Sequence, residues 1–362
     1  MKELRKSLAV VTMILLCIGI IMIYSSSGVF AMKELGDPMF FLKRHILFLM
    51  VGLILALGIM SMDYRDLQKL SKPLLVVTLV MLGLVLIPGI GKTSFGARRW
   101  FRIGPFNFQP AEMMKLTMLI YISDYLTRKK NKIGDFFQGF LPVIIVLGIT
   151  CLLIVKQPDL GSAFLLGVIV MILIYIAGAK WQHIVSLGIL MMPALYILVF
   201  RVSYRLKRII AFIDPWQDSQ GIGFQLSQSQ IALGSGGIFG VGLGHSQQKL
   251  FYLPASHTDF ILSIIGEELG LIGTMTVILL FTVFIIQGSR IAKRITDPFG
   301  YFLATGIVIL VGVQAMVNIG VSIGALPTKG LPLPFISYGG STLIFNMIFV
   351  GLLLNISRTE EL

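Results

Sequence analysis

Apolar residues fill the chain in successive runs that are separated by short polar or charged segments. Most runs are close to twenty residues, the length that an α-helix needs to cross the ~30 Å hydrocarbon core of a bilayer. We therefore expect an all-α polytopic membrane protein, a single integral membrane domain over residues 1–362. The pattern predicts about ten spans, over residues 8–25, 42–62, 73–89, 111–127, 139–155, 159–178, 182–200, 260–287, 299–322 and 335–355.

Composition agrees with this class, since 56% of the residues are hydrophobic, 13% are charged and the mean hydropathy is +0.89. A soluble domain carries about twice that charge. The first run follows a basic start and could pass for a signal peptide, but an uncleaved span fits the many later spans better. Cys17 and Cys151 lie inside apolar runs, so they predict packing residues and no disulfide or metal framework.

The net charge of +13 has two interpretations, nucleic-acid binding or the positive-inside bias of a membrane protein. The loops after the second, fourth and eighth predicted spans are basic, as is the N-terminus, which predicts cytoplasmic N- and C-termini and no nucleic-acid partner. The remaining Lys and Arg residues are nearly as numerous on the predicted outer side. That outer charge indicates an anionic ligand handled at the outer face.

The segment 201–259, between the seventh and eighth predicted spans, is far longer than its neighbours. Loops of this length are functional or disordered, and this one has no low-complexity run, so we expect it to be ordered and functional. Its glycine-rich stretch 234–244, "GSGGIFGVGLG", follows no strand and lacks dinucleotide-motif spacing. Close approach of backbone to backbone, or to a ligand, is the favoured interpretation. Likewise "GIGKTS" (89–94) has Leu86 where a phosphate loop needs Gly, which favours a simple turn.

A basic and aromatic segment precedes the fourth predicted span. Arg98, Arg99 and Arg102 flank Trp100, a composition that suits the rim of a site for a phosphate-bearing amphiphile. Pro110 is well placed in the first helical turn. Glu112 and Lys115 share a helix face and can pair, which would orient the span without any role in binding.

Two further outer segments carry candidates. Asp159, in "KQPDLGSA", is expected to cap the following helix, in preference to contacting a ligand. The stretch 323–342 holds three prolines and four glycines around Lys329, which suggests either a rigid turn with a snorkelling lysine or the wall of a cavity.

Three carboxylates stand at the start of the eighth predicted span: Asp259, Glu267 and Glu268. Carboxylates in lipid are costly and need a partner, water or a function. As a helix, residues 260–287 would be ~42 Å long, which exceeds the hydrocarbon core. Asp259 is therefore expected above the lipid, on a loop or helical extension that lines an outer cavity, and Glu267 and Glu268 are expected to be paired within the bundle.

Several of these stretches, in this order, resemble the SEDS family (shape, elongation, division, sporulation): "RRWFRIGPFNFQPAE", "QPDLGSA", "GSGGIFGVGLG", "LPASHTDFILSIIGEELG" and "LPTKGLPLPFISYGGST". The resemblance covers essentially the whole chain. Lys329 is typical of the division branch more than of the elongation branch, and the sporulation branch is also close. Ala111 and Ala255 depart from the family's usual Ser and Glu.

The resemblance implies a peptidoglycan glycosyltransferase that polymerises lipid II on the outer face of the cytoplasmic membrane, at the division septum. It implies Asp259, in "HTDF", as the catalytic residue, with His257 and Thr258 beside it as substrate-binding candidates. Arg98, Arg99, Trp100 and Lys329 are the other substrate-binding candidates. Glu112, Lys115, Asp159, Glu267 and Glu268 are expected to support the site.

The implied partners are lipid II, a class B penicillin-binding protein and other membrane proteins of the divisome. No residue constellation establishes a cofactor, although a divalent cation could share in stabilising the leaving group. Two alternatives remain open from the sequence: a transporter that flips the lipid-linked precursor, and a non-catalytic division scaffold. A transport site is expected near mid-bilayer, and a scaffold should tolerate substitution of Asp259.

Overall fold

Helices dominate the computed structural model, which describes residues 1–94, 96–104, 106–218, 221–250, 252–254, 256–328 and 330–359. Lys329 and Ala255, both singled out in the sequence, lie outside the described residues. The first helices are α1 (Lys2–Leu35), α2 (Phe40–Ser61), α3 (Asp66–Lys69), α4 (Ser71–Leu84), α5 (Pro110–Arg128), α6 (Leu141–Lys156) and α7 (Leu160–Ile176). The remaining α-helices are α8 (Trp181–Phe200), α9 (Ser203–Ile213), α10 (Phe224–Ser235), α11 (Ile261–Ala292), α12 (Pro298–Ser322) and α13 (Gly340–Thr359). A 3₁₀ turn, Lys130–Lys132, and a π-helical turn, Phe136–Phe140, lie between α5 and α6.

The chain is a mostly helical, polytopic membrane protein. Within its described part, six helices are long and apolar enough to cross a membrane: Lys2–Leu35, Phe40–Ser61, Phe136–Lys156, Ile261–Ala292, Pro298–Ser322 and Gly340–Thr359. Two shorter apolar helices, Ser71–Leu84 and Leu160–Ile176, lie beside them. A helix also covers each of the other two predicted ranges, since α5 spans 110–128 and α8 spans 181–200.

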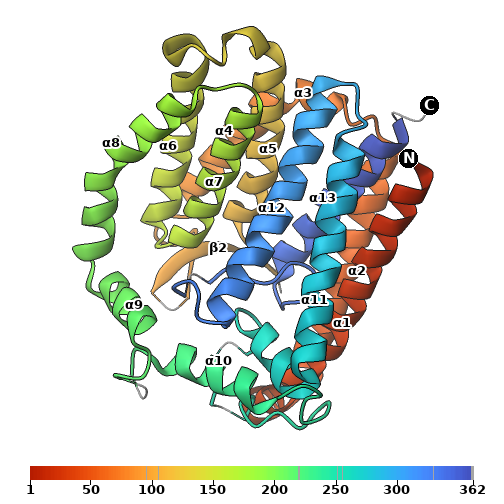
Figure 1. The fold of residues 1–362 in the computed structure, drawn as a ribbon, viewed down its shortest axis with the longest axis vertical. Helices are drawn as coiled ribbons and strands as arrows, with labels where there is room; N and C mark the ends of the chain where they lie inside the picture. Colours follow the sequence, from red (N-terminus) through yellow and green to blue (C-terminus); the bar gives the residue numbers. More distant parts are fainter. Residues whose placement is uncertain are drawn as a thin grey trace.

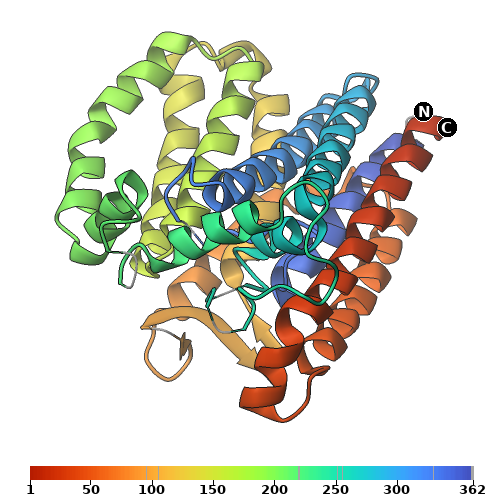
Figure 2. The ribbon, with the colours of Figure 1, turned by 60° about the horizontal axis from the view of Figure 1, so that its bottom comes forward.

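Helix α5 is central, and this explains its polar composition. Most of its side chains are buried against protein, including those of Glu112, Lys115 and Asp124. A helix enclosed by other helices does not need an apolar face toward lipid, and its charges can pair inside the bundle. By contrast, α8 curves along the edge of the molecule in Figures 1 and 2, and its described side chains are all at least partly exposed.

Both termini lie together at one end of the bundle, and α10 crosses the opposite end (Figures 1 and 2). We call this opposite end the α10 end. The segment 90–110, between the third and fourth predicted spans, forms a small antiparallel sheet there, in the order β1 (Lys92–Ser94), β2 (Ala97–Ile103) and β3 (Phe106–Phe108). The aromatic and β-branched residues Trp100, Phe101 and Ile103 in "ARRWFRI" suit a strand, and the sheet leads directly into α5.

Within its described residues, the long segment 201–259 contains α9 and α10. Its glycine-rich part makes close backbone contact with α11, which confirms that interpretation of "GSGGIFGVGLG". The "GIGKTS" stretch runs into strand β1 and not into a helix, so it lacks the context of a phosphate loop.

Candidate active site

Asp259 lies in a turn, 256–260, immediately before α11 begins at Ile261. Of the two expected positions, a loop or a helical extension, the structure therefore has the loop. Asn318 of α12 fixes this turn, since its Nδ2 donates to the carbonyl oxygens of Asp259 and Leu331, both at 2.8 Å. One buried amide thus joins the Asp259 turn to the proline-rich segment before α13.

Two more bonds join the same pair of segments. The Ser337 hydroxyl donates to the Thr258 carbonyl at 2.6 Å, and the Tyr338 backbone N–H donates to the His257 carbonyl at 2.9 Å. On the facing segment, a Cβ built on Gly330 would lie 3.5 Å from Asp259 Oδ2. The carboxylate therefore faces the backbone next to the Lys329 position, and glycine leaves room at this point.

Burial raises the pKa of the Asp259 carboxyl from its usual 3.8 to about 6. Neighbouring charges contribute to the same value: the positive charges of Arg208 and Arg99 lower the pKa, and the negative charge of Asp159 raises it. The net effect of burial and neighbouring charges is a pKa for this carboxyl that lies close to neutral pH. A general base is most effective when its pKa lies near the working pH, so the environment suits proton abstraction.

Glu267 and Glu268 hold the loop that returns to Asp259, so both are paired as expected. Glu267 accepts hydrogen bonds from the Ser246 hydroxyl and from the backbone N–H groups of Gln247 and Gln248. Glu268 accepts from Lys249 Nζ and from the Ser25 hydroxyl of α1, each at 2.7 Å. Lys249 and Glu268 are both buried, and their ion pair ties the loop to two helices.

The backbone of the same loop replaces part of the hydrogen-bond ladder of α11. Gly270 has φ 67° and ψ −161°, which interrupts the helix. The Glu267 and Glu268 carbonyls accept from Val241 and Gly242, both at 3.0 Å, while the Leu271 and Ile272 N–H groups donate to Gly237 and Ile238. We call these four bonds the α11 interlock. A Cβ on Gly240 or Gly270 would collide with the opposing backbone, so the glycines permit this approach.

Arg98 and Arg99, both half-buried on β2, donate hydrogen bonds from their guanidinium groups to nearby oxygens. Arg98 donates to the Thr93 hydroxyl at 3.3 Å and to the Leu86 carbonyl at 3.4 Å. Arg99 donates to the Gln157 carbonyl at 2.9 Å and to the Pro158 carbonyl. These bonds attach the sheet to the α4 and α6 helix ends. Binding of substrate by either arginine stays a prediction.

Asp159 caps α7, as predicted, by accepting a bond from the Ser162 backbone N–H at 3.0 Å. Gln109, just before α5, also donates to Asp159 at 3.4 Å. The cap therefore places one negative charge near Asp259, and this charge contributes to the raised pKa. Trp100, half-buried, lies one strand position from Arg99 and opposite Lys92.

The predicted pair of Glu112 and Lys115 is present, with 2.7 Å between Oε2 and Nζ, and both side chains are buried. Lys115 also donates to Gln314 Oε1 at 3.2 Å, and Gln314 Nε2 donates to the Pro332 carbonyl at 2.9 Å. The pair is thus connected to the segment that faces Asp259.

His257 lies in an aromatic cluster, with ring centroids 4.7 Å from Phe41, 5.9 Å from Phe30 and 5.9 Å from Tyr338. Burial lowers the pKa of His257 to about 4, so the ring is neutral at neutral pH. This environment fixes the turn before Asp259. Contact of His257 or Thr258 with a substrate remains a prediction.

Sequence reasoning missed Lys249, Asn318, Ser337 and Arg208. Asn318 carried a signal, because an amide inside an apolar span predicts a buried partner. Lys249 resembled an ordinary loop cation. Within the described residues, no three His, Cys, Asp or Glu side chains are grouped to hold a metal ion, so no ligand set can be named for a divalent cation.

Long apolar helices around a buried polar site at one end define an integral membrane protein with a buried carboxylate at the end of the helical bundle. The chain belongs to the FtsW/RodA/SpoVE family of cell cycle proteins, whose model matches residues 5–362.

Close relatives are known by name. The chain is 46% identical to a probable peptidoglycan glycosyltransferase FtsW of Geobacter sulfurreducens, over 95% of this chain and 92% of the relative. It is 44% identical to stage V sporulation protein E of Bacillus subtilis, over 97% and 96%.

Two solved structures have the same fold. One describes the structural coordination of polymerization and crosslinking by a peptidoglycan synthase complex, with TM-score 0.80, 27% identity and coverage of 98% of this chain and 97% of that chain. The rod shape determining protein RodA of Thermus thermophilus matches with TM-score 0.73, 27% identity and the same coverage.

Proposed function

We propose that this protein is a peptidoglycan glycosyltransferase that polymerises lipid II during cell division. Family membership and relatives named as FtsW, at 46% identity over nearly the whole chain, support the enzyme class. In the proposed topology ten helices cross the cytoplasmic membrane, both termini are cytoplasmic, and the α10 end with its segment 201–259 faces outward. The relative of known structure that acts in a peptidoglycan synthase complex supports a class B penicillin-binding protein as partner.

In the proposed reaction, Asp259 removes the proton from the acceptor sugar hydroxyl of one lipid-linked disaccharide. The hydroxyl oxygen then bonds to the anomeric carbon of the donor, and the bond from that carbon to the pyrophosphate oxygen breaks. A β-1,4 linkage forms, undecaprenyl pyrophosphate leaves, and the proton stays on Asp259 until solvent removes it. A positioned general base contributes about 10²–10⁴-fold to such a step.

The observation that carries the proposal is the position of Asp259 in a turn outside α11, with a pKa of about 6 and its carboxylate toward Gly330. A carboxylate at the end of the bundle suits chemistry on a lipid headgroup, whereas a transport site is expected near mid-bilayer.

The test is polymerisation of lipid II by the purified protein with its class B partner. Asp259→Asn should lower the rate about 10²-fold or more, whereas Asp37→Asn, an exposed carboxylate paired with Lys43, should retain the normal rate. If Asp259→Asn protein that is folded and partner-bound makes glycan strands at the normal rate, Asp259 is not the base. Wild-type protein that moves lipid II between leaflets without forming polymer would favour the transporter alternative.

A further inference from the structure

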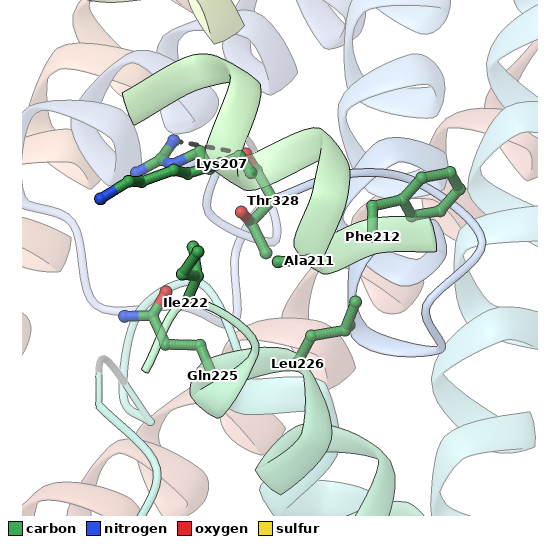
Figure 3. A pocket seen from close by; sticks show the side chains of 8 residues that line it. Lys207, Ala211, Phe212, Ile222, Gln225, Leu226 and Thr328 are labelled. Atoms are coloured by element: carbon green, nitrogen blue, oxygen red, sulfur yellow. Dashed lines mark hydrogen bonds between the residues drawn. The ribbon is translucent and has the colours of Figure 1, made fainter. Parts of the chain in front are cut away.

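A cavity of about 290 Å³ lies between α9, α10 and Thr328 (Figure 3). Its two ends differ in chemistry. Lys207 and the amide of Gln225 lie toward one end in the close-up, whereas Phe212 and Leu226 lie toward the other. Among the sequence candidates that the structure describes, none lines this cavity, so it is separate from the predicted rim around Trp100.

The cavity adjoins the Asp259 site. Arg208, which also lines the cavity, donates from Nη1 to the Thr328 carbonyl at 3.3 Å. Thr328 is two residues from Gly330, the residue that faces the Asp259 carboxylate. Arg208 is also near enough for its charge to lower the pKa of Asp259. The cationic end of the cavity is therefore the end next to the Asp259 site, and a ligand group bound at that end would lie beside the proposed reacting centre.

Two basic residues next to an apolar end suit an anion that carries a hydrocarbon tail. Oxygen-rich anions such as phosphate and diphosphate form strong, charge-assisted bonds with Lys and Arg. The volume is near the lower limit of ~300 Å³ for small-molecule sites, so it suits a head group and the start of a chain and not a whole lipid.

We infer that this cavity binds the diphosphate and the first isoprene units of a prenyl diphosphate lipid, with Lys207 and Arg208 on the phosphates and Phe212 on the hydrocarbon. Naming this ligand rests on the proposed function, in which a prenyl diphosphate is the leaving group. Lys207 and Arg208 then stabilise the charge that develops as the bond to the sugar breaks.

The experiment measures binding of farnesyl pyrophosphate to the full-length Asp259→Asn protein in detergent, a background that cannot complete the proposed reaction. Lys207→Met should weaken binding roughly tenfold, because it removes one charge-assisted contact. Lys207→Arg should retain binding. The matched control is Lys43→Met, since Lys43 is another exposed lysine at the α10 end whose ion pair with Asp37 is also exposed.

Two further ligands separate the contributions of head and tail. Inorganic pyrophosphate should compete, with the same loss in Lys207→Met, whereas Phe212→Ala should weaken farnesyl pyrophosphate more than pyrophosphate. The inference is overturned if Lys207→Met leaves the affinity unchanged, or if farnesol binds as tightly as farnesyl pyrophosphate.

These outcomes are independent of the polymerisation assay. A wild-type protein that makes no polymer but shows the Lys207 effect would overturn the proposed enzyme and keep the anion site. A protein that polymerises normally and shows no Lys207 effect would overturn the anion site alone.

Discussion

Two parts of the molecule, the segment 236–260 that carries Asp259 and the α8–α9 segment, are attached to the bundle in different ways. The segment 236–260 is fixed by the buried Lys249–Glu268 pair, the α11 interlock and the bonds from Asn318 and Ser337. By contrast, α8 shows no buried side chain among those described. The following helix, α9, contacts the 326–338 segment through the Arg208–Thr328 bond.

The difference matches two separate requirements of a polymerase. A general base must be held within a fraction of an ångström of its working position, which needs many short-range bonds from packed helices. A site that receives and releases a long lipid needs an open approach from the membrane. The predictions below test this contrast, from the largest expected effect to the smallest.

Gly270→Ala should have the largest effect on stability, because Gly270 lies at the centre of the α11 interlock. Gly270 has a backbone conformation that is essentially restricted to glycine, at a cost of about 1–3 kcal/mol for other residues. The added Cβ also meets backbone atoms of Ile238 and Gly240, and each displaced hydrogen bond costs ~1 kcal/mol. We expect a loss of more than about 4 kcal/mol in the free energy of unfolding, measured in detergent.

The matched control is Gly148→Ala in α6, where a Cβ would meet no neighbour within 4 Å. This change should be neutral or stabilising by up to ~1 kcal/mol. Equal effects of the two substitutions would mean that the interlock does not stabilise the protein.

Lys249→Met should be the next most damaging change. Among the described residues, it leaves only Ser25 donating to the buried Glu268 carboxylate, and removing one partner of a buried ion pair costs about 3–5 kcal/mol. We expect the lower end, ~3 kcal/mol, because the Ser25 bond remains. Thermal unfolding of the variant measures the loss.

Two comparisons interpret that loss. Adding Glu268→Gln to Lys249→Met should restore part of the stability, because the unpaired charge is gone. Lys69→Met, which breaks an exposed pair with Asp66, should cost less than about 1 kcal/mol. A double variant that is less stable than Lys249→Met alone would contradict the assigned pairing.

The sequence predicted the positions of the helices well and the side-chain contacts between distant segments poorly. All ten predicted ranges contain a helix, since a run of apolar residues has few other stable structures in lipid. Glu112–Lys115 and the Asp159 cap were also predictable, because both depend on spacing of three residues. The pairing of Lys249 with Glu268 and Ser25 was not, since the contact depends on how the loop folds back across α1 and α11.

The interruption of α11 shows the same limit. In the sequence, residues 260–287 form one apolar run, and a glycine in such a run indicates either helix packing or a break. The break at Gly270 exists because the backbone of 237–242 supplies the replacement hydrogen bonds. No local rule reveals a partner thirty residues away. The sheet over 92–108 was missed for a similar reason, as short strands are stable only when other elements anchor them.

The pKa of Asp259 gives a prediction for activity and another for stability. In the proposed reaction Asp259 must be deprotonated to act as the base, so the polymerisation rate should rise with pH through about 6 and level off above 7. The folded protein holds this proton more tightly than the unfolded chain, so the charged carboxylate reduces stability as pH rises from 4 through about 6. A shift from 3.8 to about 6 corresponds to up to about 3 kcal/mol.

Asp259→Asn should therefore raise the unfolding temperature at pH 8 and leave it nearly unchanged at pH 4. Asp37→Asn should show no gain at pH 8, because hydrogen bonds from Lys43 and from the Met39 backbone N–H hold the pKa of Asp37 below its usual value. A lower unfolding temperature for Asp259→Asn at pH 8 would mean that the carboxylate stabilises the fold and that its pKa is not raised.

Leu190→Ala, on the exposed face of α8, should have the smallest effect. Leu190 is 75% exposed, and in a membrane the lipid contacts it in place of protein, so truncation leaves no cavity within the bundle. We expect a change below about 0.5 kcal/mol. Leu262→Ala, in the buried start of α11 that follows Asp259, removes a side chain that is 1% exposed and should cost about 2–5 kcal/mol. If the two substitutions are equally damaging in the purified chain, α8 is packed against protein, and the contrast between the two parts of the molecule fails. If Leu190→Ala becomes damaging only when the partner protein is present, then α8 forms part of that interface and the open side of the site is closed by assembly.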